Sequence, residues 1–273
     1  MIDLNFKYKD AIEYLRKEAP FTPEIAVVLG SGLGIFADST DNFKTIPTTD
    51  IPGYPTGSVV GHKGLIHFSK MENRKILIFQ GRLHFYEGYN LSDCVLPVLL
   101  SKKVGCNKIL FTNAAGGVNK NFAPGDLMLV ESFNSINIKK ELTILIGISS
   151  EETKNKFINC PSLKLNDTIK EIAVKNKILL HTGTYWYSKG PNYETPAEIR
   201  MIARFGGSAA GMSTVHEAIF ASSLGMEIAI ISCITNMASG ISENRLTHNE
   251  VTQTAKEASD KFTFLLKKAV PKL

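Results

Sequence analysis

Short apolar segments alternate with amphipathic ones along most of the chain. Five runs rich in aliphatic and β-branched residues predict strands at 25–29 (IAVVL), 75–79 (KILIF), 108–111 (KILF), 127–130 (LMLV) and 228–235 (IAIISCIT). Apolar residues spaced three and four apart predict helices near residues 8–18, 91–104, 164–176, 196–205, 214–224 and 248–268. This alternation predicts an α/β fold in which helices surround a mixed, largely buried sheet.

No break in the pattern divides the chain. Internal repeats, low-complexity tracts and long Pro/Gly/Ser-rich linkers are absent from the sequence, so residues 1–273 are expected to form a single domain. The least regular region is 132–163, which is polar and poor in periodicity. Because long structureless loops are uncommon within compact domains, we interpret this region as a functional loop.

Composition narrows the class of protein. A content of 44% hydrophobic and 21% charged residues is typical of a folded globular chain. The net charge is +5, but the basic residues are scattered and their longest runs are pairs such as Lys102-Lys103, unlike the basic stripe of a nucleic-acid binder. The N-terminal residues do not resemble a signal peptide, and no apolar run approaches the roughly 18 residues of a membrane span. We therefore expect a cytoplasmic protein with no nucleic-acid or membrane partner.

Glycine-rich and polar residues follow four of the predicted strands. These segments are GSGLG at 30–34, QGRLHFYEG at 80–88, TNAAGG at 112–117 and NMASG at 236–240. In open α/β sheets, ligands bind in the crevice at the carboxyl ends of the strands. The four segments are therefore expected to converge on one pocket.

Two of these segments carry groups suited to an anion. Small residues around Ser31 allow main-chain N–H groups to approach a ligand, although the segment is neither a Walker A loop nor a complete dinucleotide fingerprint. Arg82 and His84 lie on one side of an extended segment and suit a phosphate dianion, with Glu87 spaced to hydrogen-bond His84. The structural alternatives are a glycine turn at positive φ and a surface arginine beside a satisfied histidine.

Other positions also allow two interpretations. Glu194 precedes Pro196, where a helix is predicted to begin, and is either a cap stabilised by the helix dipole or a buried carboxylate that binds a ligand. The TNAAGG segment either presents main-chain donors or allows close packing of strand and helix. The four cysteines, Cys94, Cys106, Cys160 and Cys233, have no CxxC spacing, so no metal site is expected.

Taken together, eight ordered segments between about residues 20 and 255 resemble the trimeric class of purine nucleoside phosphorylases. They are VVLGSGLG, GHKG, QGRLHFYEGY, TNAAGGVN, APGDLMLV, SKGPNYETPAEIRM, AAGMSTVHE and ITNMASGIS. The resemblance implies one α/β domain around a distorted, barrel-like mixed sheet, assembled as a homotrimer. It also implies phosphorolysis of purine (deoxy)ribonucleosides such as inosine and guanosine to the free base and (deoxy)ribose 1-phosphate, in purine salvage. Inorganic phosphate is then a co-substrate, with no metal or organic cofactor.

The resemblance also implies a role for individual residues at matching positions. The phosphate shell would consist of Ser31, His62, Arg82, His84, the main chain of Ala114, and Ser213. Tyr86, the main chain of Met212, and His248 would contact the ribose. Tyr193 would stack on the purine, Glu194 would accept from N1–H, and Asn236 would bond N7 and O6. We expect Asn236, His84 and Glu194 to be catalytic, with Asn236 the main group because negative charge builds on the departing purine.

The sequence departs from the commonest family pattern in three places, one of which is the segment MASGISENRL after Asn236, which resembles the bacterial members more than the vertebrate ones. Relatives place a Phe-Pro pair where this chain has Cys160-Pro161, and that phenylalanine covers the ribose of the neighbouring subunit. Phe157 is a candidate to replace it. His216 stands where relatives usually have proline, and we interpret it as a solvent-facing residue at the start of a helix.

Three other functions are considered. A methylthioadenosine phosphorylase is disfavoured by Glu194 and Asn236, and by His248, because a thioether prefers an apolar wall. A catalytically inactive nucleoside-binding homologue would have no need to retain Arg82 and His84 beside these residues. A nucleosidase that uses water would leave the phosphate set without a task. Preference between inosine and guanosine, and acceptance of 2′-deoxy sugars, are not specified by the motifs.

Overall fold

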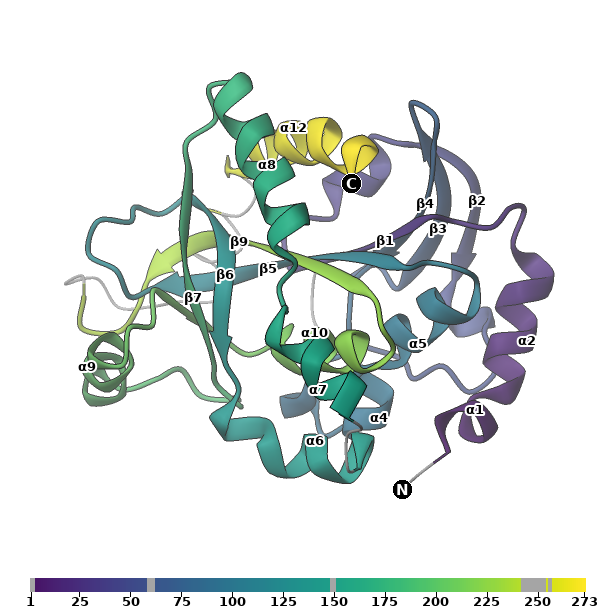
Figure 1. The fold of residues 1–273 in the computed structure, drawn as a ribbon, viewed down its shortest axis with the longest axis horizontal. Helices are drawn as coiled ribbons and strands as arrows, with labels where there is room; N and C mark the ends of the chain where they lie inside the picture. The colour runs from purple at the N-terminus through teal and green to yellow at the C-terminus, as the bar shows by residue number, and fades with distance from the viewer. Residues whose placement is uncertain (1–2, 58–61, 148–150, 242–253, 255–256) are drawn as a thin grey trace.

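A nine-stranded sheet forms the centre of the molecule, which we describe from a computed structural model covering residues 3–57, 62–147, 151–241, 254 and 257–273. The strands are β1 (Ile25–Leu29), β2 (Asp41–Pro47), β3 (Leu65–Met71), β4 (Arg74–Gln80), β5 (Lys108–Gly117), β6 (Leu127–Asn134), β7 (Leu180–Tyr187), β8 (Ala209–Gly211) and β9 (Glu227–Met237). Their order is β2-β3-β4-β1-β5-β8-β7-β6-β9, and a further pairing joins β9 back to β5. The last five strands in that order therefore close into a barrel, and the first four extend from it. The expected barrel-like mixed sheet is confirmed (Figure 1).

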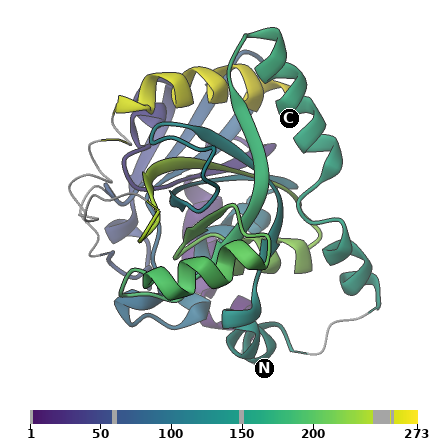
Figure 2. The same cartoon turned by 90° about the vertical axis from the view of Figure 1, so that its left-hand side faces the viewer.

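Helices cover both faces of this sheet. They are α1 (Leu4–Lys7), α2 (Lys9–Glu18), α3 (Ile35–Asp38), α4 (Leu91–Cys94), α5 (Leu96–Lys103), α6 (Lys139–Ile146), α7 (Glu151–Ile158), α8 (Leu163–Lys175), α9 (Pro196–Arg204), α10 (Val215–Ser223) and α12 (Ser259–Ala269). Helices α8 and α12 lie together on one side of the sheet, and α4, α5, α6, α7 and α10 lie on the other (Figures 1 and 2).

Strand β1 shows why the apolar runs have no polar alternation. Its neighbours are β4 and β5, both parallel to it. Val27 packs in the cluster that contains Phe262 of α12, whereas Val28 packs in the cluster that contains Val98 of α5. Both faces of the strand are therefore buried, and a run of consecutive aliphatic residues is what such a strand requires.

Several predicted boundaries need correction. Residues 132–163 are not a long loop, because they contain the end of β6 and helices α6 and α7. The predicted helix at 91–104 is two helices, and Pro97 lies in the first turn of the second, where its missing N–H costs nothing. The predicted helix at 248–268 begins outside the described residues, and its described part is α12. Strands β2, β3, β7 and β8 were not predicted, because their apolar runs are short or interrupted by polar residues.

The segments TNAAGG and NMASG do not simply follow strands. Strand β5 continues to Gly117 and β9 continues to Met237, and the two strands pair in parallel with Gly116 opposite Asn236. A Cβ atom on Gly116 would lie 3.3 Å from Nδ2 of Asn236. The small residues let the barrel strands continue side by side, so functional side chains lie within strands here and not in loops.

Candidate active site

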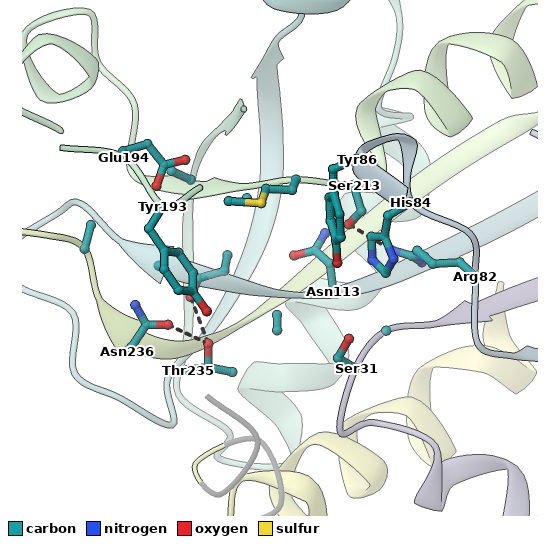
Figure 3. A pocket seen from close by; sticks show the side chains of 18 residues that line it. Ser31, Arg82, His84, Tyr86, Asn113, Tyr193, Glu194, Ser213, Thr235 and Asn236 are labelled. Atoms are coloured by element: carbon teal, nitrogen blue, oxygen red, sulfur yellow. Dashed lines mark hydrogen bonds between the residues drawn. The ribbon is translucent and has the colours of Figure 1, made fainter. Parts of the chain in front are cut away.

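A cavity of about 120 Å³ lies where β1, β5, β8 and β9 end. It is lined by Gly30, Ser31, Arg82, His84, Tyr86, Asn113, Ala114, Ala115, Gly116, Tyr193, Glu194, Ala210, Gly211, Met212, Ser213, Thr235, Asn236 and Ala238. The predicted convergence of the four segments is therefore confirmed. In Figure 3 Tyr193, Glu194 and Asn236 lie on one side of the cavity, and Ser31, Arg82, His84 and Ser213 lie on the other.

Arg82 lies in the wall of the cavity and is only 4% exposed. Its Nη1 donates to Oγ of Ser213 at 3.1 Å and to Oγ1 of Thr214 at 2.9 Å. Nη2 donates to the main-chain oxygen of Val28 at 3.2 Å, and Nε lies 3.6 Å from Oε2 of Glu217. These contacts fix the guanidinium at one end of the cavity, where it supplies a positive charge in a desolvated place.

The predicted contact between His84 and Glu87 is present. Nδ1 of His84 lies 3.1 Å from Oε1 of Glu87, which also accepts from the main-chain N–H of His84 at 2.8 Å. The His84 ring stacks between the rings of His62 and Tyr86, at centroid distances of 5.3 and 4.9 Å. The carboxylate and the two flanking rings therefore fix the orientation of the imidazole beside Arg82.

His62 is not part of the cavity wall, although it touches a residue that is. Its Nε2 lies 3.0 Å from Oγ of Ser31, and its Nδ1 lies 2.9 Å from the main-chain oxygen of Arg82. Burial, together with the nearby His84, lowers the pKa of His62 to about 4. His62 is thus neutral near pH 7 and orients Ser31. His248 lies outside the described residues.

The structure separates the two interpretations of Glu194. Helix α9 is capped by Thr195, whose hydroxyl accepts from the N–H of Glu198 while the Glu198 carboxylate accepts from the N–H of Thr195 at 2.7 Å. Glu194 therefore does not cap the helix. Its Oε1 is buried in the cavity region without a hydrogen-bond partner among the described residues. A buried, unpaired carboxylate oxygen is costly, which favours the ligand-binding interpretation.

Asn236 lies near the end of β9 and is 8% exposed. Its Oδ1 accepts a hydrogen bond from the hydroxyl of Thr235 at 2.9 Å, and its Nδ2 donates to the main-chain oxygen of Met237 at 3.1 Å. Tyr193, 44% exposed, lines the same side of the cavity. The aromatic ring, the carboxylate and the amide thus lie together, as a planar heterocycle would require (Figure 3).

Four residues of the site or its support have no role in the sequence-based interpretation. Asn113 and Thr235 line the cavity, and Thr214 and Glu217 lie directly beneath Arg82. Thr214-x-x-Glu217 matches the capping-box pattern, and the N–H of Thr214 does donate to Oε2 of Glu217 at 3.0 Å. The spacing of Thr214 and Glu217 could therefore have predicted this helix cap from the sequence. The contact of both residues with Arg82 could not be predicted, because it joins positions that are 132 or more residues apart in the sequence.

His216 contradicts its predicted position on the surface. Its side chain is 0% exposed, its ring packs against the Tyr187 ring at 5.6 Å, and neither ring nitrogen has a hydrogen-bond partner among the described residues. The first turn of α10 faces the interior here because it follows Ser213 and Thr214, which hold Arg82. His216 is therefore buried because α10 begins directly after residues that contact Arg82 in the interior.

Neither candidate for the aromatic lid lines the cavity of this chain. Cys160 is half-buried after α7, and burial raises the pKa of its thiol to about 12. Phe157 lies in a separate groove bounded by α6, α7 and α10, where its ring contacts Phe133 at 6.2 Å. Cys94, Cys106 and Cys233 are buried and free. Within the described ranges, no group of three or more potential metal ligands occurs, and no helix is long and apolar enough to cross a membrane.

Comparison with known proteins identifies the family. Residues 24–271 match the model of the phosphorylase superfamily. Purine nucleoside phosphorylase 1 of Geobacillus stearothermophilus is 40% identical over 266 residues, which cover 96% of each chain. Purine nucleoside phosphorylase of Schistosoma mansoni in complex with inosine superposes with a TM-score of 0.90 at 30% identity, covering 100% of this chain and 98% of that one. The same enzyme in complex with adenosine gives a TM-score of 0.88 at 29% identity, covering 98% and 97%. The chain therefore belongs to the phosphorylase superfamily and, within it, to the purine nucleoside phosphorylases.

Proposed function

We propose that this protein cleaves 6-oxopurine nucleosides such as inosine and guanosine with inorganic phosphate, releasing the base and ribose 1-phosphate. The observation that carries the proposal is the single cavity, which joins an anion-binding end containing Arg82 and Ser213 to a base-binding end containing Glu194 and Asn236. The relative in complex with inosine supports the choice of substrate.

The reaction breaks the bond between C1′ of the ribose and N9 of the purine and forms a bond between C1′ and a phosphate oxygen. The electron pair of the broken bond stays on the purine, and overall the base takes up the proton of the phosphate monoanion or dianion. Nδ2 of Asn236 is the group we assign to N7 of the leaving base, where a donor stabilises charge that exists only late in the reaction. The positive charge of Arg82 holds the nucleophile on the opposite side of the sugar.

Glu194 gives the proposal its specificity. A carboxylate oxygen accepts from N1–H of hypoxanthine or guanine, but it faces a lone pair at the same position in adenine. Leaving such a group unpaired costs binding free energy, so adenosine is expected to react slowly. The adenosine complex of the Schistosoma relative indicates that binding of adenosine alone is a weak criterion, and turnover has to be compared.

Further features belong to the same proposal. Tyr86 and Met212 line the cavity, and we assign the Tyr86 side chain and the Met212 main chain to the ribose, with His248 assigned to the 5′-hydroxyl. A homotrimer, a role in purine salvage and independence from metals and organic cofactors are proposed from the family resemblance, and a cytoplasmic location is proposed from the sequence. Phe157 is proposed as the aromatic residue that a neighbouring subunit receives.

The test follows base release from inosine with and without phosphate, alongside guanosine, adenosine and methylthioadenosine. The proposal requires that release depend on phosphate, yield ribose 1-phosphate and be fastest with inosine or guanosine. Release without phosphate would make the enzyme a nucleosidase, and faster turnover of methylthioadenosine would reassign the purine and 5′ subsites. Phosphate-independent binding of inosine with no turnover would indicate a catalytically inactive binding protein.

A further inference from the structure

Thr214 lies at the centre of a buried polar network beneath the anion-binding end of the cavity. Its side chain is fully buried, and its hydroxyl lies within hydrogen-bond distance of three other side chains. Oγ1 accepts from Nη1 of Arg82 at 2.9 Å and from Nδ2 of Asn113 at 3.1 Å. The same atom lies 3.0 Å from Oγ of Ser213. No motif match assigns a role to Thr214, whose neighbour Ser213 is the residue that lines the cavity.

The number of partners fixes the direction of these hydrogen bonds. A hydroxyl has one hydrogen to donate and two lone pairs to accept with. Arg82 and Asn113 occupy both lone pairs of Thr214, so the Thr214 hydrogen must go to Ser213. Ser213 then accepts from Thr214 and also from Nη1 of Arg82 at 3.1 Å, which fills both of its own lone pairs. The Ser213 hydroxyl can therefore only donate. Its acceptor is either the neighbouring hydroxyl of Tyr185 or a ligand in the cavity that Ser213 lines.

The backbone at Thr214 adopts a strained conformation that maintains this arrangement of hydroxyl groups. Thr214 has φ 73° and ψ −47°, and the N–H of Val215 donates to the carbonyl oxygen of Ser213 at 2.8 Å, which closes a strained γ-turn. A β-branched residue rarely adopts a positive φ, and strain of this kind is retained where surrounding contacts require it. The turn places the hydroxyls of Ser213 and Thr214 side by side on Nη1 of Arg82.

Most N–H groups of the Arg82 guanidinium face oxygen atoms of the protein itself. Two N–H groups on Nη1 and one on Nη2 donate to oxygens of Ser213, Thr214 and Val28, and Nε faces Glu217. Few of its donors are left for a ligand, so the charge of the guanidinium polarises the hydroxyl of Ser213. The O–H group of Ser213 is then the donor that Arg82 presents to an anion.

We infer that Thr214 is a positioning residue for phosphate: its hydroxyl orders the hydrogen bonds so that the Ser213 hydroxyl is left as a donor for the anion. The inference rests on the proposed phosphorolysis for its substrate, but not on turnover for its test. Thr214 does not line the cavity, whereas Ser213 does, so the effect of Thr214 passes through Ser213. Loss of the Thr214 hydroxyl should weaken phosphate and leave nucleoside binding nearly unchanged.

The experiment measures phosphate binding by calorimetry, and the KM values for phosphate and inosine, in five variants. Thr214→Val removes the hydroxyl and keeps the shape, Thr214→Ser keeps the hydroxyl, and Thr214→Gly removes the hydroxyl while favouring the positive φ. Ser213→Ala and the double variant Ser213→Ala with Thr214→Val complete a cycle. Thr168→Val in α8, where the hydroxyl donates to the main-chain oxygen of Lys164 in the same helix, serves as the matched control.

We expect the Kd for phosphate to rise about 10- to 100-fold in Thr214→Val and Thr214→Gly, as for loss of one hydrogen bond to a charged group. Thr214→Ser should stay within about threefold of the wild type, and the KM for inosine should change less than about threefold throughout. Because Thr214 acts through Ser213, the double variant should bind phosphate no more weakly than Ser213→Ala.

Three results would overturn the inference. They are additive effects of Ser213→Ala and Thr214→Val, an unchanged Kd in a folded Thr214→Gly variant, or equal increases in the KM values for phosphate and inosine. Thr214→Gly keeps the test decisive if Thr214→Val does not fold. A wild-type protein that binds phosphate but does not cleave inosine would refute the proposed function, and the binding measurements would still decide the role of Thr214.

Discussion

The hydroxyl of Thr235 donates a 2.9 Å hydrogen bond to Oδ1 of Asn236, its neighbour in β9. Because Oδ1 already accepts from Thr235, the amide can offer a ligand its NH₂ group. One of the two hydrogens on Nδ2 is donated to the main-chain oxygen of Met237. The other hydrogen remains for a ligand. Thr235 thus orients the donor that we assign to N7 of the leaving purine, in the way that second-layer contacts fix catalytic groups.

Thr235→Val should lower kcat about tenfold, because the amide loses the contact that selects its orientation. The KM for phosphate should stay near the wild-type value, since Thr235 is remote from Arg82 and Ser213 in the cavity (Figure 3). Steady-state kinetics with inosine at saturating phosphate measure this, and Thr235→Ser, which retains the hydroxyl, is the matched control. An unchanged kcat in Thr235→Val, or an equal loss in both variants, would show that the hydrogen bond does not orient the amide.

Asn236→Ala removes the donor itself. The loss of one preorganised donor raises a reaction barrier by roughly 2.7 to 4 kcal/mol, so kcat should fall about 10²- to 10³-fold. Single-turnover measurements with inosine isolate the chemical step from product release. A loss confined to KM would instead assign Asn236 to ground-state binding of the base.

Glu217→Ala tests the buried ion pair of Arg82 and Glu217 beneath the anion-binding end of the cavity. The side chains of Arg82 and Glu217 are 1% and 0% exposed, and removing one member of such a pair leaves an uncompensated charge. Burial raises the pKa of Glu217, while Arg82 opposes that shift. We expect the free energy of unfolding in urea to fall by about 3–5 kcal/mol. Glu217→Gln, which can still accept from the N–H of Thr214, should lose less.

The matched control is Glu131→Ala, which removes a surface partner of Lys170 at 2.7 Å. Exposed pairs of this kind contribute about 0–1 kcal/mol. Equal losses in Glu217→Ala and Glu131→Ala would mean that burial of the Arg82–Glu217 pair has no energetic consequence. A stable Glu217→Ala variant would contradict the prediction directly.

How far the sequence predicts this structure depends on the range of the contacts. Strands β1 and β5 and helix α9 follow from apolar runs and from Pro196, because these signals are local. The clustering of Ser31, Arg82, Glu194 and Asn236 also follows, from the motif resemblance and from their places near strand ends. Strands β2 and β8 were hard to predict because β2 is mostly polar and exposed and β8 has only three residues, so neither has an apolar period of its own.

The supporting residues of the site were less predictable than the residues of the cavity wall. Thr214, Glu217 and Thr235 act on other side chains, and nothing in the sequence says which side chains those are. His216 shows the same limit, because a helix start is usually exposed, whereas His216 is buried with its ring against Tyr187. Sequence patterns therefore identify residues that line a binding site more readily than residues that hold those side chains in place.

His216→Phe should make the protein less sensitive to acid. Burial, with the positive charge of Arg82 and the nearby His84, lowers the pKa of His216 to about 3. The unfolded chain takes up a proton near pH 6.5 and the folded chain does not, so the stability is complete above pH 6.5 and is lost as the pH falls toward 3, by up to about 1.4 kcal/mol per pH unit. His62, with its pKa of about 4, adds a second loss of stability over a narrower pH range.

Phenylalanine at position 216 keeps the ring against Tyr187 and leaves no unpaired nitrogen, so the free energy of unfolding at pH 7 should hold or rise. Urea unfolding at pH 7, 6 and 5 would measure the slope, with His181→Phe at a partly exposed histidine as the control. A slope unchanged in His216→Phe, or reduced equally in both variants, would contradict the prediction.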